Sequence, residues 1–107
     1  MHDILLKKLC LMKSPSSCKN KEEIRQAIDE LDRKIISLIG KRYQYVKEIV
    51  KYKEKTPDAI VAKERYNLVI ASRRALAEEN GLNPDIIEEM YKRLLQYFIQ
   101  EELDLIK

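Results

Sequence analysis

Two cations fall where the amphipathic pattern of residues 20–53 predicts apolar side chains. Hydrophobic residues recur there with the three- and four-residue spacing of a helix that buries one face. At 100° per residue, Arg42 lies at the centre of this apolar stripe, and Lys53 lies about 20° away and about 16 Å along the axis. Long side chains can reach solvent from such positions. An unpaired buried cation is costly, however, so the pair indicates either a structural ion pair or a pocket for a small anion.

A third charged residue, Glu102, lies on the apolar side of another predicted helix, within about 40° of Leu95 and Phe98 on a helical wheel. The simplest interpretation is an ion pair with Lys53 or Arg42 that serves only the fold. The alternative is a site in which one carboxyl group works beside two cations.

Arg25 lies seventeen residues before Arg42, which places it about 25 Å away along the same helix and about 100° round the axis. It therefore cannot reach the same site within one chain. A surface ion pair with Asp29, four residues on, is the default interpretation of Arg25.

The element that carries both arginines is predicted to be one long helix over about residues 21–53. Asn20 and Glu23 have the spacing of a capping box at its start. Gly40 lies inside it at a cost of about 1 kcal/mol relative to alanine, which indicates close approach by a neighbouring element.

Two further helices are predicted. The second covers about residues 58–79 and closes on Asn80-Gly81, a pair able to take the left-handed conformation that ends helices. Asn83-Pro84 then provides a cap and a first-turn proline for a third helix that continues to the C-terminus.

The composition supports an all-α protein. Only two glycines and three prolines interrupt 107 residues, too few for the turns of a sheet protein. Three helices of this length bury a modest core, so a homodimer is expected. The 21 cations are interleaved with 18 anions. Such mixing is typical of a solvated face and argues against a nucleic-acid binder.

The chain divides into a flexible leader, residues 1–19, and a helical domain, residues 20–107. Lysines interrupt the apolar residues of the leader, and it has no small-residue cleavage site, so neither a secretion signal nor a membrane segment is expected. Cys10 and Cys18 lack the spacing of a zinc site. Reduced thiols in the cytoplasm, with no metal, are the expectation.

Four segments together resemble the all-α chorismate mutase family over roughly residues 20–105. They are "EEIRQAIDELDRKIISLIGKRYQYVKEIVKYK", "AKERY", "AEENGL" and "YFIQEEL". The segments "MKSPSSC" and "AEENGL" look most like the branch that contains the isochorismate-pyruvate lyases of salicylate biosynthesis.

The resemblance implies an intertwined homodimer of three-helix chains with two shared active sites. Arg25 would enter from the other subunit, which would answer the distance problem. Arg25 and Arg42 would bind the two carboxylates of chorismate, Lys53 would bind a carboxylate and the ether oxygen, and Glu64 would meet the ring hydroxyl.

Three positions decide the character of the implied pocket. Glu102 stands where many members have a glutamine that donates to the ether oxygen, so it is expected to work protonated, because an ionised carboxylate would repel the charge that grows on that oxygen. Ile60 and Phe98 replace an Asp and a Ser of some mutases, which makes the pocket more apolar and closer to the lyase branch.

The expected function is a chorismate mutase that needs no cofactor, since a pericyclic rearrangement of chorismate to prephenate requires only a folded substrate and fixed charges. The alternative is an isochorismate-pyruvate lyase, which forms salicylate and pyruvate, or both activities in one site. The alternative outside enzymes is a helical interaction module, in which Arg42, Lys53 and Glu102 set the register of packed helices.

Overall fold

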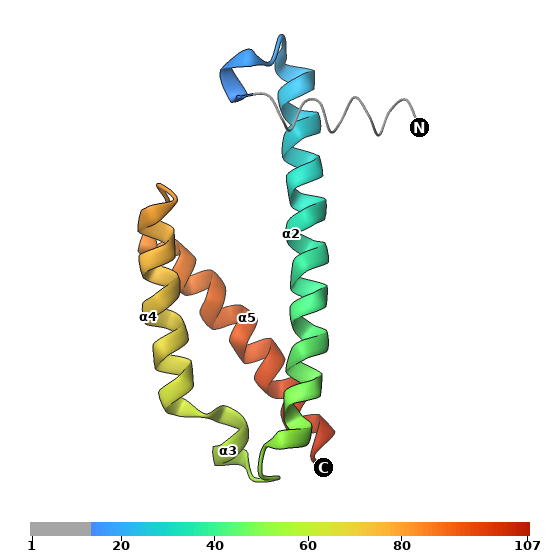
Figure 1. Cartoon of the computed structure of the whole chain (residues 1–107), viewed down its shortest axis with the longest axis vertical. Helices are drawn as coiled ribbons and strands as arrows, with labels where there is room; N and C mark the ends of the chain where they lie inside the picture. The colour runs from blue at the N-terminus through green and yellow to red at the C-terminus, as the bar shows by residue number, and fades with distance from the viewer. Residues whose placement is uncertain (1–13) are drawn as a thin grey trace. The chain divides into compact units, whose positions relative to one another are not determined.

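The computed structural model describes residues 14–107, and it is all-α: these residues contain helices and no strand (Figure 1). Most of the predicted leader, with Cys10, lies outside the described residues. The elements are η1 (Pro15–Ser17), α2 (Lys21–Ile49), η2 (Val50–Tyr52), α3 (Pro57–Val61), α4 (Lys63–Glu79) and α5 (Pro84–Leu105). The chain falls into two compact units, which divide between Arg42 and Tyr43.

The first unit contains most of α2, and its start is the predicted one. The side-chain oxygen of Asn20 accepts a hydrogen bond of 2.9 Å from the backbone N–H of Glu23, and the Glu23 carboxylate accepts one from the N–H of Lys19. The first bond pairs a backbone donor that the helix itself leaves unsatisfied, and the second fastens the residue before the cap to the first turn.

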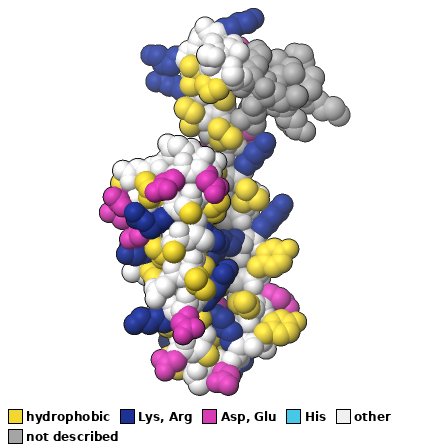
Figure 2. All heavy atoms as spheres, turned by 60° about the vertical axis from the view of Figure 1, so that its left-hand side comes forward, with side chains coloured by type: hydrophobic (Ala, Val, Ile, Leu, Met, Phe, Trp, Pro, Cys, Tyr) yellow, Lys and Arg dark blue, Asp and Glu magenta, His cyan; other side chains and the backbone are white. Residues whose placement is uncertain are grey.

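The apolar residues of the first part of α2 lie on the surface of the single chain. Ile24, Ile28, Leu31 and Ile35, here called the α2 stripe, are each about half exposed. Figure 2 shows hydrophobic side chains at the surface of the upper part of the molecule. A Cβ atom added at Gly40 would meet nothing within 4 Å, so its expected close neighbour is not found among the described residues of the chain.

The prediction that the first helix continues to residue 53 is wrong. The α-helix ends at Ile49, Val50–Tyr52 tighten into a 3₁₀ turn, and Lys53 is extended, with φ −96° and ψ 150°. The ammonium of Lys55 donates to the carbonyl of Val50 and, at 3.2 Å, to that of Lys53. These bonds satisfy carbonyl groups at the helix end, so the chain can leave the helix there.

The second predicted helix is interrupted, which the sequence pattern did not indicate. Ala62 has φ 46° and ψ 62°, in the left-handed region, and separates α3 from α4. Such a conformation costs about 1–2 kcal/mol in a residue with a Cβ atom. No glycine marks the position. Thr56 caps α3 by accepting a 3.2 Å bond from the N–H of Ala59, and Pro57 occupies the first helical position.

The turn between α4 and α5 is the predicted one. Gly81 has φ 70°, and the N–H groups of Gly81 and Leu82 donate to Glu78 at 3.1 Å and Ala77 at 2.8 Å, which is a Schellman motif. Asn83 then caps α5 by accepting a 2.9 Å bond from the N–H of Asp85.

The two helices joined by this turn, α4 and α5, pack on each other in the second unit (Figure 1). Val69 and Ile70 of α4 and Leu95 of α5 form a buried cluster. Removing these side chains from water supplies the main stabilisation of the pair, about 25 cal/mol per Å² of apolar surface.

An ion-pair network fastens the same two helices at the surface. Arg74 of α4 contacts Asp85 at 2.9 Å and Glu88 at 3.1 Å on α5, and Lys92 contacts Glu88 at 2.9 Å. The hydrogen bond from Lys92 and the nearby guanidinium of Arg74 lower the pKa of Glu88. The hydrogen bond to Asp85 raises the pKa of Arg74.

Candidate functional site

The centre of the candidate site is a shielded ion pair between Lys53 and Glu102. The ammonium nitrogen of Lys53 lies 3.1 Å from Oε1 of Glu102, and the two side chains keep 21% and 6% of their exposed surface. Glu102 is the buried charged residue of the described chain. The pairing expected from the apolar side of the third helix is therefore present, and its partner is Lys53.

A second acceptor holds the same ammonium group. Lys53 also donates a 3.1 Å hydrogen bond to the backbone carbonyl of Ile60. In an uninterrupted helix this carbonyl would accept from the N–H of Glu64, four residues on. The left-handed conformation of Ala62 interrupts that helix, so the break leaves the carbonyl available to Lys53. No sequence pattern indicates this backbone contact.

Buried apolar residues lie near the pair in the sequence or in contact with Lys53. Ile60 and Phe98 keep only 1% and 2% of their exposed surface, and Val50, three residues before Lys53, keeps 6%. Phe98 lies one turn before Glu102 on α5. Because burial excludes water, electrostatic interactions of Lys53 and Glu102 are stronger than they would be at an exposed surface.

The last turns of α5 also contact α2 through an aromatic residue that the sequence analysis did not single out. The ring of Tyr43 stacks on Phe98, with centroids 5.4 Å apart and planes 7° apart. The Tyr43 hydroxyl donates a 2.9 Å hydrogen bond to Oε2 of Glu101, next to Glu102. This bond, with partial burial, raises the pKa of Tyr43 above its usual value. A tyrosine beside a helical stripe has no sequence marker that would have revealed this contact.

The remaining predicted site residues are Glu64, Arg25 and Arg42. Glu64 is exposed in the first turn of α4, where the helix dipole favours a carboxylate. Arg25 and Arg42 belong to the first unit. Arg42 is partly buried, with its Nη1 atom shielded from solvent, whereas Arg25 is exposed and enters none of the ion pairs among residues 14–107.

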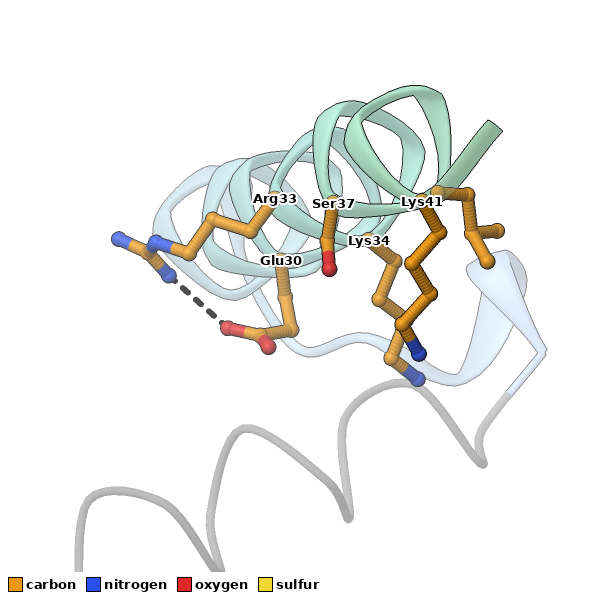
Figure 3. Close-up of a pocket in the computed structure, with 6 residues that line it drawn as sticks. Glu30, Arg33, Lys34, Ser37 and Lys41 are labelled. Carbon is orange, nitrogen blue, oxygen red and sulfur yellow. Dashed lines mark hydrogen bonds and ion pairs between the residues drawn. The ribbon is translucent and has the colours of Figure 1, made fainter. Parts of the chain in front are cut away.

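A separate hollow of about 410 Å³ lies along α2 in the first unit (Figure 3). It is lined by Glu30, Arg33, Lys34, Ser37, Leu38 and Lys41. Arg33 is paired with Glu30 at 2.9 Å, and the side chains come from successive turns of one helix. None of the predicted site residues lines this hollow.

Among residues 14–107, no group of three or more His, Cys, Asp or Glu side chains is placed to hold a metal ion. None of the helices in this part of the chain is both long and apolar enough to cross a membrane.

Comparison with known proteins adds a family and three relatives. The family model described as chorismate mutase type II matches residues 24–103. The isochorismate pyruvate lyase of Pseudomonas aeruginosa is 35% identical over 92 residues, which cover 86% of this chain and 90% of that protein.

The other two relatives share a shorter region. The chorismate mutase of Methanocaldococcus jannaschii is 29% identical over 75 residues, or 70% of this chain and 76% of that protein. The T-protein of Haemophilus influenzae is 35% identical over 75 residues, but the chain covers only 20% of its length.

Proposed function

Because the chain belongs to the chorismate mutase type II family, we propose that it is a chorismate mutase, which rearranges chorismate to prephenate. The observation that carries this proposal is the shielded contact between Lys53 and Glu102. Both groups are fixed before any ligand arrives, as electrostatic stabilisation of a transition state requires.

Lys53 is the residue to which we assign the largest role. An ammonium group has three N–H donors, and two of them are directed at Glu102 and at the carbonyl of Ile60. The third is available to an anionic ligand. Negative charge grows on the ether oxygen of chorismate as its C–O bond breaks, so a cation held there would lower the barrier without a nucleophile or a proton transfer.

Glu102 is proposed to donate a hydrogen bond to the same ether oxygen in its protonated form. Its carboxyl group lies against Lys53. A protonated carboxyl group can donate a hydrogen bond, whereas an ionised one would repel the negative charge that grows on that oxygen.

The remaining roles rest on the family resemblance. Arg42 is proposed to bind one substrate carboxylate, and Arg25 of a second subunit to bind the other. Glu64 is proposed to meet the ring hydroxyl. Ile60 and Phe98, both buried, would form the apolar walls that keep water from the reacting bond.

A homodimer is part of the proposal. The half-exposed α2 stripe supports it, because four large aliphatic side chains on one helix face are costly to leave in water. Arg25 could join a shared site only from a second chain. The cysteine pattern supports the cytoplasm as the location.

An isochorismate-pyruvate lyase is the second candidate. It is supported by the lyase relative, whose match to this chain covers 90% of its own length. Isochorismate carries the same enolpyruvyl ether, so its cleavage to salicylate and pyruvate would develop similar charge near Lys53.

The test is to incubate the purified protein with chorismate and, separately, with isochorismate, and to identify the products. Prephenate from chorismate is the expected result. Salicylate and pyruvate from isochorismate, with no prephenate from chorismate, would favour the lyase over the mutase. Turnover of neither substrate would favour the helical interaction module.

A further inference from the structure

Tyr43 touches α5 at two points on either side of the turn that carries Glu102. Its ring stacks on Phe98, four residues before Glu102, and its hydroxyl hydrogen-bonds to Glu101, the residue immediately before it. Tyr97 adds a tilted ring contact to Tyr43 at 6.2 Å.

These contacts constrain α5 in two different ways. Stacking on Phe98 fixes the distance between α2 and α5 at this level. The hydrogen bond to Glu101 fixes the rotation of α5 about its own axis, because residues 98 and 101 project in directions about 60° apart. A helix held at two such points cannot turn without losing one contact. The direction in which Glu102 projects is then set as well.

The Tyr43 ring has a further contact within α2. The ammonium of Lys47, one turn later on that helix, lies over the ring, 4.7 Å from its centroid. A cation over an aromatic face is an attractive contact. The Tyr43 ring is thus held by Lys47 as well as by Phe98.

We propose that Tyr43 is a positioning residue for the reaction: by holding Phe98 and Glu101, it aligns the Glu102 carboxyl group with Lys53 and with the substrate ether oxygen. This inference rests on the function proposed above. Tyr43 itself touches neither of the two proposed catalytic groups in any contact described for residues 14–107. It acts through α5, and its hydroxyl carries the rotational part of that role.

The test removes the hydroxyl and keeps the ring. Tyr43→Phe is expected to lower kcat about five- to tenfold while KM changes by less than about twofold, because the contact affects the transition state more than substrate binding. Tyr45→Phe is the matched control, since Tyr45 is a 78% exposed tyrosine two residues on in the same helix. It should keep the kinetics of the unmodified protein.

Variants of Glu101 separate positioning from simple stabilisation. Glu101→Gln keeps an acceptor for the Tyr43 hydroxyl and should retain most of kcat. Glu101→Leu removes the acceptor and should match Tyr43→Phe. The double variant Tyr43→Phe with Glu101→Leu should be no worse than either single variant, as expected for two residues that act through one bond. Additive losses would overturn the proposal.

A spectroscopic measurement tests the positioning role without any turnover. The carbon resonance of the Glu102 carboxyl group, identified by its loss in Glu102→Gln, should shift at fixed pH in folded Tyr43→Phe and stay in place in Tyr45→Phe. A purely structural role would lower stability but leave this resonance unchanged in the folded molecules. An unchanged resonance therefore overturns the inference. Failure of the function itself would show separately, as absence of turnover by the unmodified protein.

Discussion

Lys53 and Glu102 form a shielded charged contact, and we propose that its value lies in catalysis more than in stability. Desolvation of two charges offsets most of their attraction, so replacing such a pair by apolar residues is often neutral for stability. Removing one partner alone is different, because it leaves an unpaired charge with 6% or 21% of its surface exposed. In the proposed role the same shielding strengthens the interaction of Lys53 with the substrate ether oxygen.

Glu102→Gln tests the protonation state assigned to Glu102. A glutamine amide donates a hydrogen bond at every pH, whereas a glutamate donates only when protonated. We expect the variant to keep its activity at acidic pH, within about threefold, and to extend it to higher pH, where the unmodified enzyme declines. The measurement is kcat/KM for chorismate from pH 5 to 9. A steep loss at every pH would contradict the donor role.

For single residues, the sequence predicted which charged side chains face inward better than it predicted the groups that they contact. Helical spacing alone placed Glu102 on a buried face, and the structure confirms that it is buried. The contacts of Lys53 with the Ile60 carbonyl and of Tyr43 with Glu101 were not predictable. Both depend on how distant segments pack, which periodicity along one helix does not contain.

At the scale of elements, helix starts and the α4–α5 turn were predictable, while two interruptions were not. Asn20, Asn83 and Gly81 act through bonds to residues two or three positions away, so their local sequence is sufficient. The end of α2 and the break at Ala62 have no such signal. The break at Ala62 leaves the Ile60 carbonyl free of its helical partner, and Lys53 donates to that carbonyl. This contact forms only in the folded chain.

The network between α4 and α5 predicts how stability depends on pH. The pKa of Glu88 is lowered in the folded chain from its ordinary value of 4.5. The stabilisation that ionised Glu88 contributes is therefore fully present at a pH above its ordinary pKa. It is lost as the pH falls through the lower pKa that Glu88 has in the folded chain. Glu88→Gln should lower Tm by a few degrees at pH 7, and the difference from the unmodified protein should shrink as the pH falls below 4.5.

Glu89→Gln is the matched control for this measurement, because Glu89 is an exposed glutamate on the same helix. Its Tm should follow that of the unmodified protein throughout. A difference for Glu88→Gln that persists unchanged at pH 3 would contradict the ion-pair explanation.

For the whole molecule, the proposed active site requires a second chain. The α2 stripe remains half exposed in one chain, and Arg25 lies about 25 Å from Arg42 along the helix axis. Composition predicted the need for a partner, and the family resemblance supplied the geometry of a shared site. A pattern within one sequence describes only which face is apolar. In the proposed homodimer, the surface that covers this face belongs to the second chain.

Mixing two inactive variants tests the shared site. Arg25→Ala and Arg42→Ala should each lose most of the activity, since each removes a cation that binds a substrate carboxylate. After the two proteins are mixed and allowed to exchange subunits, half of the molecules should be heterodimers in which one of two sites has both arginines. Activity should therefore recover to about a quarter of that of the unmodified protein. Sites completed within one chain would show no recovery.

The catalytic role proposed for Lys53 is tested most directly by kcat/KM of Lys53→Met with chorismate. The unmodified protein and Lys51→Met are measured beside it. Lys51 is an exposed lysine two residues earlier that pairs with Glu48. Loss of the charge at the ether oxygen should reduce kcat/KM by at least about 100-fold, the effect of removing one donor to a developing oxyanion. Lys51→Met should leave it within about twofold. Equal kcat/KM for Lys53→Met and the unmodified protein would contradict the assignment of this ion pair as the catalytic centre.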